Sequence, residues 1–442
     1  MNQLQLFLPC AAGVEDFLAA EVQRITGVGQ LQRSRGGVSL EASWRDALRL
    51  NLHSRLAQRV LVRLWHGPYR DERDLYDAAM DVAWEIWFTP QQTIKVELTA
   101  QHSPLQSLNF AALKLKDAVC DRFRDKRGER PSVDTQRPDV RLFGHLTAET
   151  LTLYIDTTGE PLFKRGWRED KGDAPLKETL AAAMIAATGW DASADQPLDA
   201  IAPLYDPCCG SGTVVIEAAQ IALHIAPGLR RRFAFERLLP FQAHVWQALK
   251  ADAVAQQREW PAGHAPIVFG SDVSFRMVDF AQRNAERAGV AHAVELRGGD
   301  ALQRTPPTAR PGVLLLNPPY GERIAAAGVA GENAAARAQR MAPRAPRTFT
   351  VGAPRPAAAG QGRESAQMAD GSDGSDFFNR LAAHWKTHYA GWSAWLLTPD
   401  FKLPGKMRFK ESRRVPLWNG PIECRLFRFD LVARAPRPPA QA

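Results

Sequence analysis

Residues 313–320 read Val313-Leu314-Leu315-Leu316-Asn317-Pro318-Pro319-Tyr320, an apolar run followed by an asparagine, two prolines and a tyrosine. The apolar run predicts a buried strand. Because proline lacks an N–H and fixes φ, the two prolines predict a stiff turn where that strand ends. Open α/β folds keep their chemistry at strand ends, so the four residues after the run form a candidate site.

The chemistry of this turn suits an amino group. The Asn317 side-chain oxygen and the Pro318 backbone carbonyl can accept the two hydrogens of an exocyclic base amine and orient its nitrogen for attack. Tyr320 offers a flat face on which the base can stack. An ordinary proline turn behind a core strand would have the same sequence, so the motif alone leaves both interpretations open.

A second segment follows another predicted strand, Leu204 to Asp206, and opens a helix: Asp206-Pro207-Cys208-Cys209-Gly210-Ser211-Gly212-Thr213. Its glycines allow a sharp turn and the close approach of a ligand. A dinucleotide fingerprint would have a third glycine at the position of Ile216. The segment therefore favours a ligand other than a pyrophosphate.

Carboxylates recur after three successive predicted strands, at Asp206, Asp272 and Asp300. Parallel strands would bring all three into one crevice together with Asn317. Asp272 suits a ribose diol, Asp300 an adenine amino group, and Asp206 the positive part of a sulfonium amino acid. Together they fit S-adenosylmethionine, although each acid taken singly is more simply a turn or helix-cap residue.

The first part of the chain predicts a small α+β module. We expect strands at residues 4–8, 37–40, 59–64, 93–98, 140–146 and 150–156, and helices at 14–25, 44–56, 75–87 and 110–127. The last helix and its tail carry a basic face formed by Lys114, Lys116, Arg122, Arg124, Lys126, Arg127 and Arg130. This face either only faces solvent or binds the backbone phosphates of a nucleic acid.

From residue 204 onward, strands and helices alternate as they do in a parallel sheet. We expect strands at 204–206, 267–272, 294–298, 313–317 and 394–398, an antiparallel closing strand at 422–432, and helices at 214–224 and 274–288. A further helix is expected to begin with Pro175 in its first turn. Residues 325–375 lack apolar periodicity and predict a disordered insertion, whose arginines either hold nucleic acid or belong to an inert linker. Residues 435–442 predict a disordered tail.

Composition limits the class of protein. The 442 residues include 56 Lys and Arg against 48 Asp and Glu, and the resulting net charge of +8 favours a polyanionic partner. The 5 cysteines are odd in number and scattered, which indicates a reducing, cytoplasmic compartment. The sequence shows no basic leader and no apolar run of membrane-spanning length, so we expect neither export nor a membrane. His384 and His388 have helical ligand spacing but no third ligand, so no metal is expected.

Five segments together resemble one known family, the THUMP-domain class I methyltransferases, and within it most closely the bacterial 23S ribosomal RNA guanine-N2 methyltransferases. The segments are 175–183 (PLKETLAAA), 206–213 (DPCCGSGT), 317–323 (NPPYGER), 410–414 (KESRR) and 418–424 (WNGPIEC). The similarity extends from about Leu4 to Leu431. This resemblance covers nearly the whole chain.

The resemblance implies an α/β fold: a Rossmann-like class I methyltransferase domain with a mostly parallel seven-stranded sheet, preceded by an α+β ferredoxin-like/THUMP module. The implied bounds are 1–60 (ferredoxin-like), 61–160 (THUMP) and 170–434 (methyltransferase). It implies S-adenosylmethionine as cofactor and RNA, either 23S rRNA or a large-subunit assembly intermediate, as partner. Implied cofactor-binding residues are Asp206, Cys208, Gly210, Gly212, Thr213, Asp272, Asp300 and Asn317, and implied catalytic residues are Asn317, Pro318, Pro319 and Tyr320.

The chain departs from the family pattern in two ways. The insertion after Arg323 is unusually long, and no second methyltransferase domain follows as it does in the fused enzymes, so a single modification is expected. Two other functions stay open. One is methylation of adenine N6 in RNA or DNA, because the same turn would serve that amine. The other is a non-catalytic RNA-binding factor in ribosome assembly.

Overall fold

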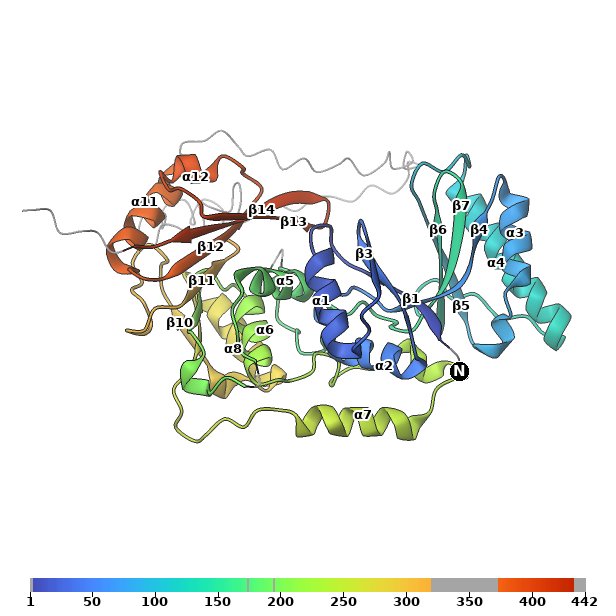
Figure 1. Ribbon diagram of the computed structural model, residues 1–442, viewed down its shortest axis with the longest axis horizontal. Coiled ribbons are helices and arrows are strands. Elements are labelled where there is room, and N and C mark those ends of the chain that lie inside the picture. Colours follow the sequence, from blue (N-terminus) through green and yellow to red (C-terminus); the bar gives the residue numbers. More distant parts are fainter. Residues whose placement is uncertain (1–2, 173–174, 194, 319–372, 433–442) are drawn as a thin grey trace, which may run out of the picture.

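The structure is a computed structural model, and it describes residues 3–172, 175–193, 195–318 and 373–432. Two seven-stranded sheets organise these residues (Figure 1). The N-terminal sheet has the order β2-β3-β1-β4-β7-β6-β5, and the C-terminal sheet has the order β10-β9-β8-β11-β12-β14-β13. This arrangement confirms the predicted fold class, an α/β domain preceded by an α+β module.

The N-terminal sheet is continuous across both halves of the α+β module. Its strands are β1 (Leu4–Pro9), β2 (Leu31–Ser34), β3 (Gly37–Ala42), β4 (Leu61–Pro68), β5 (Ile94–Ala100), β6 (Val140–Leu146) and β7 (Thr150–Asp156). Its helices are α1 (Glu15–Thr26), α2 (Trp44–His53), α3 (Glu72–Asp81), the 3-10 helix η1 (Trp84–Ile86) and α4 (Leu108–Arg127). A short antiparallel pairing of β1 with β4 joins the halves, with Leu6 opposite Val62 and Phe7 opposite Leu61.

The C-terminal sheet pairs β10, β9, β8, β11 and β12 in parallel, and then adds β14 and β13 antiparallel. Its strands are β8 (Leu204–Asp206), β9 (Val268–Asp272), β10 (Val294–Gly298), β11 (Val313–Leu316), β12 (Ser393–Thr398), β13 (Arg413–Asn419) and β14 (Ile422–Asp430). Its helices are α5 (Glu178–Thr188), α6 (Thr213–Ala222), α7 (Ala243–Ala255), α8 (Phe275–Ala288), α11 (Asp373–His388) and α12 (Leu403–Lys406). Short 3-10 helices are η2 (Leu198–Ala200), η3 (Ala234–Arg237) and η4 (Ala291–Ala293).

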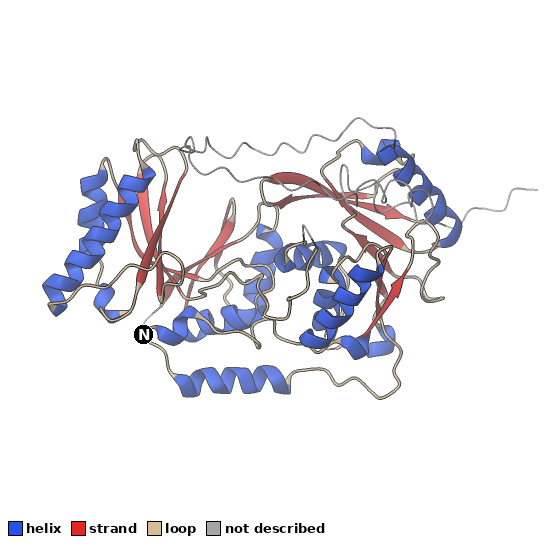
Figure 2. Ribbon diagram, turned by 180° about the vertical axis from the view of Figure 1, so that it is seen from behind, coloured by secondary structure: helices blue, strands red, loops and turns tan. Residues whose placement is uncertain are grey.

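Both faces of the C-terminal sheet are covered by helices (Figure 2). Alternate residues of β11 belong to separate cores, because successive side chains of a strand point to opposite faces. Leu315 lies in the core that also contains residues of α5 and α6, whereas Leu314 and Leu316 lie in the core that contains Trp385 of α11. The first of these cores continues into the N-terminal half of the molecule.

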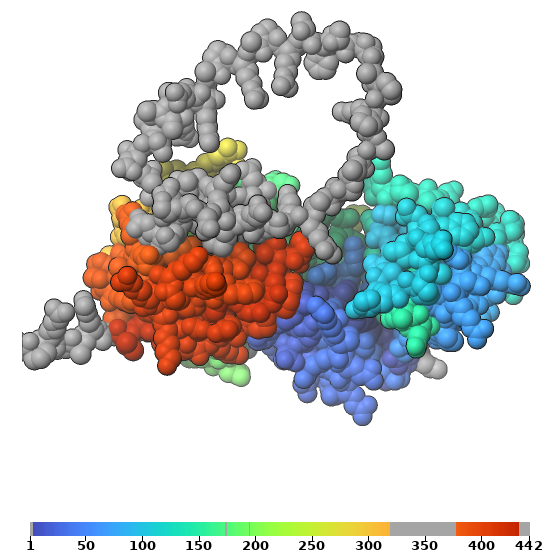
Figure 3. Space-filling view, turned by 90° about the horizontal axis from the view of Figure 1, so that it is seen from above, coloured from blue at the N-terminus to red at the C-terminus, as the bar shows by residue number. Residues whose placement is uncertain are grey.

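The two halves lie side by side along the longest axis. Seen from above, residues of β4–β7 and α3–α4 lie at one end and the C-terminal strands at the other, with the first N-terminal residues between them (Figure 3). A segment that we call the linker, residues 157–177, runs from the end of β7 to the start of α5. Within the described residues, none of the helices combines the length and apolar character needed to cross a bilayer.

Several element bounds differ from the prediction. The expected helix at 75–87 is α3 followed by η1, because Val82 between them is extended, with φ −73° and ψ 129°. Helix α2 ends at His53 rather than at Leu56, and α5 begins at Glu178, so Pro175 precedes the helix instead of occupying its first turn. Helix α11 begins at Asp373, inside the expected insertion, whereas residues 325–372 and the tail 435–442 lie outside the described residues.

Candidate active site

The candidate site lies where two neighbouring parallel strands end. Strand β8 pairs with β11, with Leu204 opposite Val313 and Tyr205 opposite Leu314. Asp206 is the last residue of β8 and Asn317 directly follows β11, so both lie at the carboxyl edge of the sheet. From β8, the sheet continues through β9 and β10 on one side and through β11 on the other. A crevice at such a reversal of strand order is the usual ligand site of open α/β sheets.

We name residues 207–213, the loop after β8, the cofactor loop, because the sequence predicts that it binds the cofactor. Gly210 and Gly212 have φ of +53° and +87°, in the left-handed region that only glycine adopts at low cost. A Cβ on Gly212 would lie 3.0 Å from the Cβ of Ala281 in α8. The Gly212 N–H donates to the Cys209 carbonyl at 2.8 Å, and Thr213 then begins α6. Gly212 therefore leaves room for α8, whereas a Cβ on Gly210 would meet no atom within 4 Å, so Gly210 is the glycine at which a ligand can approach the backbone.

Two carboxylates lie beside this loop, the buried Asp206 and the half-buried Asp272. Asp206 is 2% exposed and accepts the Cys208 N–H at 3.0 Å. Burial raises the pKa of Asp206 to about 8, and the negative charge of Asp272 contributes in the same direction. Burial also raises the pKa of Asp272. Because nearby positive charge favours an ionised carboxylate, Asp206 fits a cationic group such as the sulfonium amino acid part of S-adenosylmethionine.

The third predicted carboxylate follows β10. The parallel register of β9 and β10 ends with Gly298 opposite Asp272, and the Gly299 N–H donates to the Asp272 carbonyl at 3.0 Å. Asp300 comes next and accepts the Leu302 N–H at 2.9 Å. Its carboxylate thus stabilises a turn, as the simpler sequence interpretation stated, while the turn itself lies beside the end of β9.

The turn after β11 lies partly outside the described residues. Asn317 is half-buried and Pro318 is buried, both directly after β11. Pro319 and Tyr320 lie outside the described residues. Cys208 is half-buried in the cofactor loop, where burial and the charges of Asp206 and Asp272 raise the pKa of its thiol.

Sequence reasoning missed an aromatic ring at the same edge. Phe275, the first residue of α8, is 78% exposed, and a Cβ on Gly298 would lie 2.4 Å from its ring. The ring therefore lies against the end of β10, within three positions of Asp272. Nothing in the sequence marks this ring, because the exposure of a phenylalanine at the start of a helix depends on tertiary packing and single exposed apolar residues are common.

Sequence reasoning also missed two polar residues that hold the cofactor loop. Arg168 of the linker donates to the Thr213 hydroxyl at 2.8 Å and to the Ser211 hydroxyl at 3.4 Å. Asn284 of α8, which is fully buried, donates to the Ser211 carbonyl at 3.1 Å. These contacts could not be predicted from local sequence patterns, because the residues that they join are distant in sequence.

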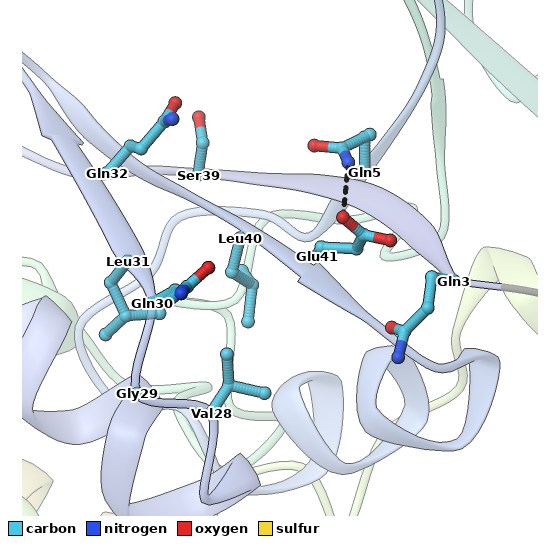
Figure 4. A pocket seen from close by; sticks show the side chains of 10 residues that line it. All are labelled: Gln3, Gln5, Val28, Gly29, Gln30, Leu31, Gln32, Ser39, Leu40 and Glu41. Atoms are coloured by element: carbon cyan, nitrogen blue, oxygen red, sulfur yellow. Dashed lines mark hydrogen bonds between the residues drawn. The ribbon is translucent and has the colours of Figure 1, made fainter.

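Two cavities among the described residues lie elsewhere. One, of about 690 Å³, opens over β1, β2 and β3 and is lined by glutamines and by Glu41, which accepts a hydrogen bond from Gln5 at 3.2 Å (Figure 4). The other, of about 1070 Å³, lies between α1 and α2 on one side and α5, α6 and α7 on the other. Neither is lined by Asp206, Asp272 or Asn317, so the site is defined by strand ends and not by cavity size.

The basic face of α4 is partly neutralised. Arg122 pairs with Glu85 at 2.6 Å, Arg124 pairs with Asp121 at 2.8 Å, and Lys116 pairs with its neighbour Asp117. At the other end of the chain, the Nε2 atom of His384 hydrogen-bonds the Arg304 carbonyl at 2.7 Å. Among the described residues, no cluster of three or more His, Cys, Asp or Glu side chains is arranged to hold a metal ion.

Comparison with protein families matches three domains in succession. Residues 5–61 match the RlmL ferredoxin-like domain, residues 69–156 the THUMP domain, and residues 165–345 the RMKL-like methyltransferase domain. A ribosomal RNA large subunit methyltransferase K/L of Psychromonas ingrahamii is 33% identical over 435 residues, which cover 98% of this chain and 51% of that protein. The chain therefore spans about half the length of the curated relatives it matches.

Two solved structures share the whole architecture. A proposed methyltransferase complexed with SAH has a TM-score of 0.77 at 24% identity, covering 99% of this chain and 100% of that chain. An N6-adenine-specific DNA methylase predicted in Listeria monocytogenes has a TM-score of 0.75 at 25% identity, covering 97% of this chain and 96% of that chain. With these three matches in succession, the chain consists of a ferredoxin-like domain, a THUMP domain and an RMKL-like methyltransferase domain.

Proposed function

We propose that this protein is an S-adenosylmethionine-dependent RNA methyltransferase that modifies the exocyclic N2 of a guanine in 23S ribosomal RNA. The observation that carries the proposal is the placement of Asn317 and the cofactor loop at the ends of adjacent strands. The name of the Psychromonas relative supports a ribosomal RNA substrate. The THUMP match supports contact with RNA through the N-terminal half.

The residues of the chain act by binding and orientation. S-adenosylmethionine supplies an activated methyl group on a positively charged sulfur. Asp206 would neutralise the cationic part of the cofactor, Asp272 would accept from its ribose, and Asp300 from its adenine, with Phe275 as an apolar face. Gly210, where a Cβ would meet no atom within 4 Å, leaves room for the cofactor beside the loop backbone.

The amine is held by the turn after β11. The Asn317 side-chain oxygen and the Pro318 carbonyl would accept the two hydrogens of guanine N2, so that its nitrogen points at the cofactor pocket. Tyr320 would stack on the base. No residue with a tuned pKa is required, because the proton of the amine can pass to water after transfer. A paired guanine would have to be single-stranded or flipped out to reach this turn.

The test is a substitution at the turn. Asn317→Ala should abolish methyl transfer to ribosomal RNA while calorimetry shows S-adenosylmethionine affinity close to that of the unchanged protein. Mass analysis of nucleosides from 23S RNA of cells lacking the protein should show the loss of one N2-methylguanosine. Wild-type transfer rates in the Asn317→Ala protein would refute the role of the turn.

Adenine N6 is the second candidate substrate, and the name of the Listeria structure favours it. The same nucleoside analysis separates the two, because N6-methyladenosine and N2-methylguanosine are distinct products. A non-catalytic RNA-binding role in assembly of the large subunit is the third. Failure to bind S-adenosylmethionine in calorimetry, together with tight RNA binding, would favour it. We infer that the protein works in the cytoplasm, where precursor ribosomal RNA would meet it.

A further inference from the structure

The linker is fixed to the ferredoxin-like domain at its start. Asn51 of α2 donates through its amide nitrogen to the Thr157 hydroxyl at 2.8 Å, and the Thr158 hydroxyl donates to the Asn51 amide oxygen at 2.7 Å. All three side chains are fully buried. Since buried polar groups are costly to separate from their partners, this junction holds the first residues of the linker in one place.

The middle of the linker is fixed to α6, the helix that the cofactor loop opens. Glu217 of α6 is fully buried and accepts from Arg165 of the linker at 3.0 Å. It also accepts from Arg55, which follows α2, at 3.1 Å. Arg165 further donates to the Arg55 carbonyl at 2.7 Å. One carboxylate therefore holds the ferredoxin-like domain, the linker and α6 together.

Three residues beyond Arg165, the linker reaches the cofactor loop through Arg168. The guanidinium donates to Glu178 of α5 at 2.8 Å and to the Leu176 carbonyl at 3.1 Å. It also donates to the hydroxyls of Ser211 and Thr213. Arg168 thus connects α5 to the loop from a position that the linker fixes.

The next linker residues are pinned to α8. Asp170 accepts from Arg283 at 2.8 Å and also pairs with Arg287, and both arginines belong to α8. The amide nitrogen of Asn284 donates both to the Asp170 carbonyl, at 2.8 Å, and to the Ser211 carbonyl, at 3.1 Å. Arg168 therefore has little freedom to move away from the loop.

We propose that Arg168 is a positioning residue for the cofactor, which fixes the cofactor loop through the hydroxyls of Ser211 and Thr213. The inference rests on the proposed function only in naming S-adenosylmethionine as the ligand. The loop contains two glycines with positive φ, so its backbone has many alternatives to the binding conformation. A planar guanidinium that donates to two hydroxyls at once favours a single backbone conformation of the loop. Arg168 acts on the cofactor through the loop and not by touching it.

Calorimetric titration with S-adenosylmethionine, without RNA, tests this role. Arg168→Gln should weaken binding about tenfold, which corresponds to about 1.4 kcal/mol. The KM for S-adenosylmethionine should rise in parallel, while kcat at saturating cofactor should change little. Arg168→Lys should restore part of the affinity, because lysine keeps the charge beside Glu178 but lacks the planar fork. The control is Arg297→Gln, which removes an exposed arginine of β10 that pairs with Glu295.

A double-mutant cycle separates positioning from direct contact. Thr213→Val removes the hydroxyl to which Arg168 donates, and it should weaken binding by a similar factor. The two changes combined should cost little more than either alone if they act on the same contact. Additive losses would mean that Thr213 touches the cofactor independently, and they would overturn the proposal.

The remaining outcomes are also decisive. Arg168→Gln protein that binds S-adenosylmethionine as tightly as the unchanged protein would refute the positioning role. If Arg168→Gln fails to fold, Thr213→Val with Thr213→Ser as its hydroxyl-retaining control answers the question. Affinity must then fall for valine and not for serine, or the proposal fails. If the wild-type protein binds S-adenosylmethionine but does not methylate guanine, the proposed substrate is refuted. The role of Arg168 in cofactor binding is not affected by that result.

Discussion

The carboxylate of Asp272 accepts the backbone N–H of Gly210 at 3.0 Å through one oxygen and the N–H of Ser274 at 2.9 Å through the other. A single side chain at the end of β9 therefore connects the cofactor loop to the start of α8. Since the loop follows β8, this contact fixes the distance between two neighbouring strand ends on which the proposed pocket depends.

Removing that carboxylate should loosen the loop. Asp272→Ala leaves the half-buried N–H groups of Gly210 and Ser274 without their acceptor, and each lost hydrogen bond costs about 0.5–1.5 kcal/mol of stability. Urea unfolding should show this loss, and calorimetry should show weakened S-adenosylmethionine binding. Asp279→Asn on α8 is the control, because its side chain is 60% exposed and the change should stay within about 0.5 kcal/mol. Equal stability of the two variants would contradict the role assigned to Asp272.

Asp206 should make the stability of the ligand-free protein depend on pH. Its pKa rises from the ordinary 3.8 to about 8 on folding, because the site is buried. The folded state therefore binds this proton more tightly than the unfolded state, and stability is lost as pH rises from about 4 to about 8. Asp206→Asn should remove this part of the slope. Urea unfolding at several pH values, compared between the two proteins, measures it, and identical slopes would count against a neutral Asp206.

The same carboxyl should make cofactor affinity depend on pH. A positively charged ligand beside Asp206 favours the ionised form, so binding below about pH 8 releases a proton. Affinity for S-adenosylmethionine should therefore rise between about pH 6.5 and about pH 8.5, in proportion to the ionised fraction. The side-chain amide of the Asp206→Asn variant cannot ionise, so the affinity of that variant should be weaker and nearly independent of pH. Calorimetry in buffers of different ionisation enthalpy counts the released proton directly.

Glu217 should be essential for joining the halves of the molecule. Glu217→Ala would leave the buried guanidiniums of Arg55 and Arg165 without their shared carboxylate, which costs about 3–5 kcal/mol. Thermal unfolding should then show a lowered midpoint or two separate transitions. The matched control is Glu295→Gln, whose pairing with the exposed Arg297 should contribute less than about 1 kcal/mol. Comparable losses in both variants would contradict this account.

Phe275 should contribute to cofactor binding without stabilising the fold. Its side chain is 78% exposed, so Phe275→Ala removes little buried surface and should leave the unfolding midpoint unchanged. If the ring covers the adenine, KM for S-adenosylmethionine should rise several-fold, about 1 kcal/mol for a lost stacking contact. Phe401→Ala, at a second exposed phenylalanine, is the control. An unchanged KM would remove Phe275 from the pocket.

Two strands of the N-terminal sheet, β6 and β7, have the predicted bounds, 140–146 and 150–156. In β6 the buried residues recur at every second position, as in a half-buried strand. Strand β7 is buried at five of its seven positions and is rich in threonine, leucine, tyrosine and isoleucine, which favour strands or buried positions. Strands β2 and β13 were not predicted. Both lie at sheet edges, β2 is mostly exposed, and β13 contains Pro416, which a strand tolerates at an edge but which argues against a strand in sequence.

The candidate site divides in the same way. Asp206, Asp272 and Asn317 could be placed together in advance, because each follows a predicted strand and parallel strand ends converge. Arg168 could not be placed, since it contacts residues 43 and 45 positions away and nothing in the intervening sequence fixes that distance in space. Tertiary packing alone decides which distant polar groups meet.

The short pairing of β1 with β4 has a consequence for taking the molecule apart. A THUMP fragment beginning at residue 61 would lose β1, and the backbone donors and acceptors of Leu61 and Val62 that face it would become open. An open strand edge recruits strands from other molecules, so such a fragment would tend to oligomerise or aggregate on expression. The ferredoxin-like domain therefore also covers the edge of β4. The ferredoxin-like and THUMP domains should be expressed and purified together.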